Sequence, residues 1–214
     1  YQTAYMKANF PIEYMASVLT ADSGDVDKVS ESITELNRMK IPVLPPNINE
    51  SFGDFTVVGK SIRFGLSSIK NFGEGIGELI INEREQNGKF KSLADFLERV
   101  QNKNLNKKSL ESLIKAGALD EFGERGQMLF NMEYLQQFNK EHSEMVNNHD
   151  TLLGALPEDS TPAKLNLEKS KPASQGDKLF WEKELLGLYI SGHPLDKFKE
   201  KLKKRGSGKK DVKN

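Results

Sequence analysis

The chain has 214 residues, of which 36% are hydrophobic, and it contains no cysteine. This hydrophobic content is thin for one compact core, so we expect small helical units joined by exposed connectors, and the lack of thiols excludes disulfides and thiolate zinc sites. The 31 lysines and arginines balance the 31 aspartates and glutamates, so no global field draws the chain toward nucleic acid or an anionic membrane, and any basic surface must be local.

No apolar run approaches the roughly 20 residues that cross a bilayer, and the first residues lack a signal-peptide pattern. We therefore expect a soluble, cytoplasmic protein without a membrane partner. Tyr1 stands inside a helix-like stretch, YQTAYMKANF, which indicates that the chain begins within a longer protein.

The first part of the chain is predicted to contain two helices followed by a β-hairpin. Pro11 stands where a helix tolerates proline, in its first turn, and Asp25 is placed to cap the next helix. The prolines of IPVLPPNINES end that helix, so residues 41–51 are expected to be extended. Apolar residues then alternate in FTVVGKSIRF around Gly59-Lys60, which predicts the hairpin.

After Phe64 the pattern is helical, with helices predicted at Glu74–Arg84, Ser92–Gln101, Lys107–Ala116 and Gly126–Phe138. From residue 141 the periodicity is lost and prolines and serines gather, which is typical of a flexible linker. An amphipathic helix resumes at residue 178, and the last residues, GSGKKDVKN, are so polar that we expect a disordered or artificially added tail. These changes divide the chain into segments 1–64, 65–140, 141–177, 178–205 and 206–214.

The stretch IKNFGEGIGELI carries the most specific signal in the sequence. A short helix is predicted to end at Lys70 or Asn71, the chain turns through Gly73 and Gly75, and a second helix departs. Bare backbone at such a bend lets N–H groups reach a phosphate oxygen, assisted by the positive end of the following helix. Contacts of this kind read no base and weaken with salt. The alternative is that the two glycines only make a tight turn between helices.

A second, weaker copy follows in KKSLESLIKAGALDEFGERGQMLF. Its turn is centred on Gly117, with Lys115 at the tip and Lys107 and Lys108 at the start of the preceding helix. The local excess of basic residues is modest, so a solvated helix face is an equally good interpretation. Two paired hairpins could hold the phosphates of both strands of a duplex.

Six segments in order resemble the alpha subunit of bacterial DNA polymerase III, the replicative C-family polymerase. They are YQTAYMKANFPIEYMASVLTADSGDVDKV, IPVLPPNINESFGDFTV, IRFGLSSIKNFGEG, KSLADFLERV, NKKSLESLIKAGALD and EKELLGLYISGHPLDKF. The resemblance covers nearly all of residues 1–200.

This resemblance implies a mainly α fold with a small β-hairpin, in which a tandem helix-hairpin-helix module is attached to a helical remnant of the fingers domain and leads toward an OB-fold. It implies that Lys70, Asn71, Gly73 and Gly75 lie against duplex DNA, and that Lys115 and Gly117 mark the second hairpin. The palm carboxylates that hold magnesium for nucleotidyl transfer belong before residue 1 in that family. We therefore expect no catalytic residues and no cofactor in this chain.

The family also carries a short peptide that binds the sliding clamp, between the hairpin module and the OB-fold. HDTLLG occupies that place, with His149, Leu152 and Leu153 as the candidate clamp contacts. It departs from the family pattern, because His149 replaces a glutamine and Leu153 a phenylalanine. Two leucines in a linker can also pack on their own domain.

The sequence also bears on three other functions. A repair glycosylase combines this hairpin with a downstream aspartate, and Asp95 is the available residue, but the sequence offers too few aromatic side chains for a base-extrusion pocket. A metal site is disfavoured because His142, His149 and His193 are scattered without ligand-like spacing. The more serious rival is a protein-interaction segment, contacting the sliding clamp or the remaining domains of the polymerase, whose hairpins never meet DNA.

Overall fold

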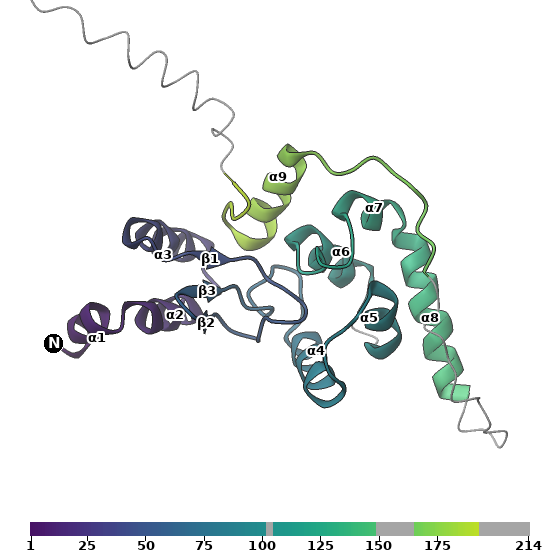
Figure 1. The fold of residues 1–214 in the computed structure, drawn as a ribbon, viewed down its shortest axis with the longest axis horizontal. Helices are drawn as coiled ribbons and strands as arrows, with labels where there is room; N and C mark the ends of the chain where they lie inside the picture. Colours follow the sequence, from purple (N-terminus) through teal and green to yellow (C-terminus); the bar gives the residue numbers. More distant parts are fainter. Residues whose placement is uncertain (102–104, 149–164, 193–214) are drawn as a thin grey trace, which may run out of the picture.

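The computed structural model describes residues 1–101, 105–148 and 165–192. The chain opens with three helices, α1 (Gln2–Asn9), α2 (Pro11–Ala21) and α3 (Val26–Met39), which lie together at one end of the molecule (Figure 1). Pro11 is in the first turn of α2, as predicted. The prediction for Asp25 is also confirmed, because its carboxylate accepts hydrogen bonds from the amides of Asp27 and Lys28 at the start of α3.

A small sheet follows, formed by β1 (Val43–Leu44), β2 (Thr56–Val58) and β3 (Ser61–Arg63). The predicted hairpin is β2 and β3, paired antiparallel, and its turn contains Gly59 with φ +61°. The segment expected to be merely extended adds β1, which pairs parallel with β3, so that the strand order is β1-β3-β2. Ile62 on the central strand is completely buried.

The rest of the fold is helical, with α4 (Glu74–Asn87), α5 (Leu93–Arg99), α6 (Lys107–Ala116), α7 (Arg125–Phe130) and α8 (Met132–Asn148). The bounds of α6 agree with the prediction, and α4 runs beyond the predicted Arg84. The predicted helix Gly126–Phe138 is wrong as a single element, because the chain breaks at Asn131. The Asn131 side chain donates to the carbonyl of Gln127 and accepts the amide of Glu168 from a distant segment.

The short helix predicted to end at Lys70 or Asn71 is also not formed. Residues 66–71 make turns instead, in which the amide of Ile69 donates to the carbonyl of Leu66 and the amide of Phe72 to that of Ile69. Asn71 then takes φ +65°, a left-handed conformation that a helix cannot continue through. The first hairpin therefore consists of a turn-rich loop and one helix, α4.

The predicted linker is more ordered at both ends than expected. Helix α8 continues to Asn148, and the last helix, α9 (Gln175–Leu186), begins before residue 178 with a capping box formed by Ser174 and Asp177. Residues 165–173, here called the strap, run along α7 and the start of α8 (Figure 1). The remainder of the linker, the end of the 178–205 segment and the predicted tail lie outside the described residues.

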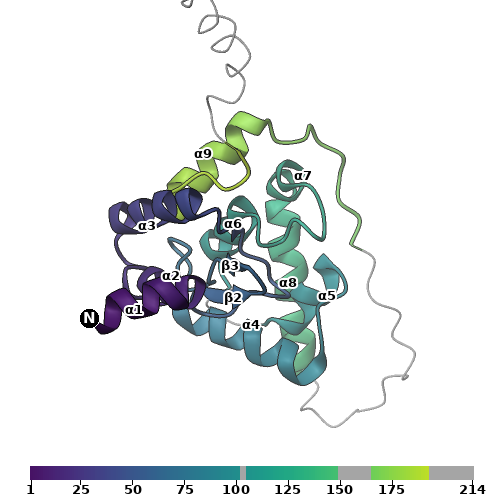
Figure 2. The same ribbon diagram turned by 60° about the vertical axis from the view of Figure 1, so that its left-hand side comes forward.

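One cluster of buried apolar side chains joins these elements, from Met15 in α2 to Leu188 beyond α9. The predicted boundary between residues 64 and 65 is not marked by a break in this core, because Phe64 and Leu66 are both almost fully buried within it. Figure 2 shows the helices arranged around the strands, with α9 lying across one side. In the described ranges, no helix is long and apolar enough to cross a membrane.

Candidate nucleic-acid interface

The first hairpin presents its bend at the surface. Phe72 is buried and anchors the loop, while Lys70, Asn71, Gly73 and Gly75 are exposed. Gly73 is the residue before the first turn of α4, with φ −78° and ψ 139°. The backbone of the loop and the start of α4 therefore both lie at the surface of the molecule.

The protein's own packing does not require glycine at either position of this bend. A Cβ built on Gly75 would have no neighbouring heavy atom of the described chain within 4 Å, and one on Gly73 would only touch the Ile76 side chain at 4.0 Å. Neither residue has the positive φ that disfavours other side chains. Open space in front of a glycine is what close approach by another molecule's backbone needs.

Backbone donors are available at this bend. The amides of Ile76 and Gly77 already donate to the carbonyl of Gly73, but the first two amides of a helix have no acceptor within it. Within the described part of the chain, no side chain caps this end of α4. The amides of Glu74 and Gly75 therefore point out of the positive end of a helix dipole, where an anion is favoured. The amide of Lys70 is committed, since it donates to the carbonyl of Leu185 at 3.0 Å.

The second hairpin is different, because Gly117, one of the predicted DNA contacts, uses its amide within the fold. Gly117 is buried and ends α6 in a left-handed conformation, φ +85°. Its amide donates to the carbonyl of Ile114, and the amide of Ala118 donates to that of Leu113. A Cβ here would lie 2.2 Å from the Arg125 guanidinium, so this glycine serves internal packing.

The start of α7, which follows the second bend, is covered by the strap. The Glu124 carboxylate accepts the amide of Gln127 at 3.1 Å and the amide of Ala173 at 3.0 Å. A Cβ on Gly126 would meet the nitrogen of Ala173 at 2.6 Å and the carbonyl oxygen of Lys171 at 3.0 Å. Glycine is needed here because another part of the same chain passes over it.

The three lysines predicted for the second half of the site differ in their surroundings. Lys115 pairs with Glu111 at 2.6 Å and lies 5.9 Å from the centre of the Trp181 ring. Lys107 and Lys108 are exposed at the start of α6, whose amides are capped by Asn106.

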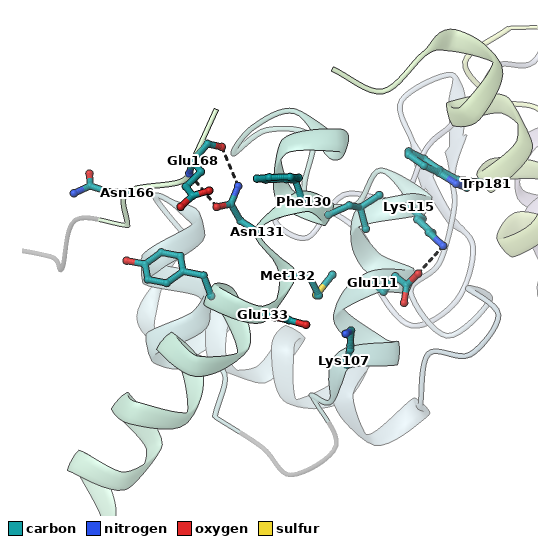
Figure 3. A pocket seen from close by; sticks show the side chains of 12 residues that line it. Lys107, Glu111, Lys115, Phe130, Asn131, Met132, Glu133, Asn166, Glu168 and Trp181 are labelled. Atoms are coloured by element: carbon teal, nitrogen blue, oxygen red, sulfur yellow. Dashed lines mark hydrogen bonds and ion pairs between the residues drawn. The ribbon is translucent and has the colours of Figure 1, made fainter. Parts of the chain in front are cut away.

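Lys107 and Lys115 face a groove of about 780 Å³ between α6, the α7–α8 junction, the strap and α9. Its walls also carry Phe130, which is exposed, and the half-buried Trp181 (Figure 3). The carboxylates of Glu111, Glu133 and Glu168 line the same groove and outnumber the two lysines. This balance of charge does not favour a phosphate backbone.

Two sets of residues that the sequence analysis did not single out hold the hairpins in place. Buried Asn49 exchanges hydrogen bonds with the backbone of Phe90 and donates to Glu121, joining the loop between β1 and β2 to both hairpin units. Buried Arg125 pairs with Asp120 and Glu182. The sequence gives no signal for either residue, since Arg125 stands between Glu124 and Gly126 at the polar start of its helix.

The rival functions gain little from the geometry. Asp95 accepts the amide of Lys91 at 2.7 Å and pairs with Arg99, so its carboxylate is used to hold its own helix. Among residues 1–101, 105–148 and 165–192, no group of three or more acidic or histidine side chains could hold a metal ion. The candidate clamp residues, His149, Leu152 and Leu153, lie outside the described residues.

The chain is similar to known proteins both in the hairpin region and over most of its length. A family model described as "Helix-hairpin-helix motif" matches residues 40–128, which include both hairpins. Proteins named DNA polymerase III subunit alpha are 46% identical over 195 residues in Thermus aquaticus, 44% over 206 residues in Deinococcus radiodurans and 44% over 207 residues in Borreliella burgdorferi. These matches cover 91%, 92% and 94% of this chain.

The mainly helical fold and the family-model match define a helix-hairpin-helix region within the chain. More particularly, the chain belongs to the family of DNA polymerase III alpha subunits, as its agreement with many of them over almost its whole length shows. It spans 16%, 15% and 18% of the length of the three relatives named above.

Proposed function

We propose that this chain binds duplex DNA at the first hairpin, through phosphate contacts that do not depend on base sequence, and so holds primer-template DNA for a replicative polymerase. The observation that carries the proposal is the surface bend at Gly73 and Gly75, where the fold itself has no use for glycine. Family membership supports it, because a polymerase subunit must hold DNA while the duplex moves past it.

The contact would use three kinds of group. The amides of Glu74 and Gly75 would donate to a phosphate oxygen, the exposed ammonium of Lys70 would pair with a neighbouring phosphate, and Asn71 would shape the loop. Only a few phosphates would be neutralised, so the total binding would be weak. Because the contacts do not depend on base sequence, the duplex could slide past them. Nucleotidyl transfer with Mg²⁺ would be the work of other parts of the polymerase, and the location would be the cytoplasm.

The direct test is titration of a labelled duplex of random sequence at several salt concentrations. We expect binding at low ionic strength that weakens as salt rises. Lys70→Glu should reduce the affinity by about tenfold, the loss of one charged contact. Lys60→Glu is the matched control, because Lys60 is exposed on the β2–β3 turn and both variants change the net charge equally.

Equal effects of the two substitutions would mean that only net charge matters and would contradict a site at the first hairpin. Absence of binding at low salt would contradict the proposal as a whole.

A second candidate function is contact with another protein domain, favoured by the exposed apolar side chains on α1 and at its end. Tyr5, Met6 and Phe10 are each more than 40% exposed, and α1 has no buried residue. Such a row of side chains fits an interface with other domains of the polymerase. Binding to the sliding clamp stays a prediction from HDTLLG alone.

A further inference from the structure

Helix α9 is fixed to the second hairpin by a buried ion pair. Glu182 is 1% exposed and Arg125 is 4% exposed, and the Arg125 Nη1 lies 3.3 Å from the Glu182 Oε1. The same guanidinium donates two hydrogen bonds of 2.7 Å to Asp120 and one of 3.1 Å to the carbonyl of Lys115. Removing either partner of a buried ion pair leaves the other charge buried without compensation, which is strongly destabilising. Glu182 and Arg125 therefore hold α9 against the second hairpin in this one arrangement.

The second oxygen of Glu182 fixes the chain that follows α9. It accepts the amides of Ile190 and Ser191 at 3.0 and 2.9 Å. Burial by itself would lower the pKa of Arg125, but the hydrogen bonds and charges of Asp120 and Glu182 outweigh burial and raise that pKa, so the guanidinium stays charged. One glutamate therefore holds both α9 and the turn after it.

One turn after Glu182, α9 also meets the first hairpin. The carbonyl of Leu185, in the last turn of α9, accepts the amide of Lys70 at 3.0 Å. Leu185 and Leu186 are buried, and they line a cavity together with Phe64, Ile69 and Lys70. The helix then ends at Gly187 in a left-handed conformation, φ +78°.

This contact matters because the first loop has little regular structure of its own. Residues 66–71 form turns, and Asn71 holds a positive φ that few non-glycine residues adopt. Such a conformation persists only when the surroundings determine it. The bond from Lys70 to Leu185 lies next to Asn71 and two residues from Phe72, whose burial is the other anchor.

We propose that α9 positions the first hairpin for DNA, and that Glu182 and Arg125 are positioning residues for the phosphate contact although neither touches DNA. The inference rests on the proposed function. It extends the DNA-binding unit beyond residue 128, where the helix-hairpin-helix match ends, to a helix that lies on the far side of the strap in sequence.

The test uses a substitution for which simple electrostatics and positioning predict opposite changes in duplex affinity. Glu182→Ala removes a negative charge, which by Coulomb attraction alone should strengthen binding to a polyanion. Positioning predicts the opposite, a loss of about fivefold in duplex affinity, because the loop is no longer held. Glu184→Ala on the exposed face of α9 is the matched control and should leave the affinity unchanged or slightly raised.

Hydrogen exchange of the Lys70 amide is the second measurement, and it needs no DNA. Exchange should speed up in Glu182→Ala and stay slow in Glu184→Ala, while the Gly117 amide inside the second hairpin is the reference for global unfolding. If Glu182→Ala does not fold, Glu182→Gln replaces it. Glutamine keeps one acceptor oxygen but loses the charge and the second acceptor, so the same two changes are expected, smaller in size.

Unchanged or tighter duplex binding by the folded Glu182 variant would overturn the inference, and so would unchanged exchange at Lys70. If the unsubstituted protein itself fails to bind duplex, the proposed function fails, whereas the exchange result still reports whether α9 holds the loop.

Discussion

Gly73 and Gly75 are informative because their neighbours leave room for a side chain. Gly65 and Gly126 would each place a Cβ within 3 Å of backbone atoms, and Gly117 has a left-handed φ, so those glycines are explained by the fold. No such reason exists at the first bend within the described residues. Glycine in an exposed first helical turn costs stability, which points to a use outside the protein.

Replacement of Gly75 by alanine is therefore expected to move stability and binding in opposite directions. The unfolding free energy should stay the same or rise by up to about 1 kcal/mol, because alanine restricts the unfolded chain and favours the helix. The duplex affinity should fall by about tenfold, since the methyl group stands where the phosphate would approach. Chemical denaturation and duplex titration measure the two quantities. A variant that is more stable and binds equally well would show that the bend does not touch DNA.

Among the helices and strands, those with local signals at both ends could be predicted from the sequence. Helix α6 has a capping asparagine before it and a left-handed glycine after it, and its predicted bounds were confirmed. The break between α7 and α8 could not be predicted, because it depends on Asn131 bonding to Glu168, a residue that only the fold brings near. The strap was missed for the same reason, since its composition resembles a linker while its backbone bonds to α7.

The attachment of the strap should depend on pH through Glu124. Burial alone would raise the pKa of this carboxyl, but hydrogen bonds from Lys178 and from the amides of Gln127 and Ala173 outweigh burial and hold the pKa below its ordinary value of 4.5. A depressed pKa stabilises the folded state above that ordinary value, and the stabilisation is lost as the pH falls through the folded-state pKa.

The measurement is the unfolding free energy of the unsubstituted protein minus that of Glu124→Gln, determined across the acidic range. We expect a constant difference at neutral pH that shrinks once the pH drops below about 4.5. Other acidic groups titrate in both proteins, so the difference isolates Glu124. A difference independent of pH would show that the charge of this carboxylate does not hold the strap.

In the molecule as a whole, the two hairpins of the predicted site differ in their surroundings. The first bend faces open space, whereas Gly117 and Gly126 of the second are packed against other parts of the chain. From the sequence, the second hairpin is a weaker copy of the first, but each combines glycine with lysine and both were predicted to contact DNA. The difference arises from the tertiary structure, which packs Arg125 against Gly117 and lays the strap over Gly126. The balanced net charge of this chain fits the proposal, since without a global field the proposed DNA binding would depend on a local contact.

The most direct test of this account follows the backbone amides by NMR during titration with a random-sequence duplex. We predict that the amide signals of Gly73, Glu74 and Gly75 shift as DNA is added, that the shifts are reversed by salt, and that the signal of Gly117 does not move. Shifts centred on Gly117 with a silent first bend would contradict the account.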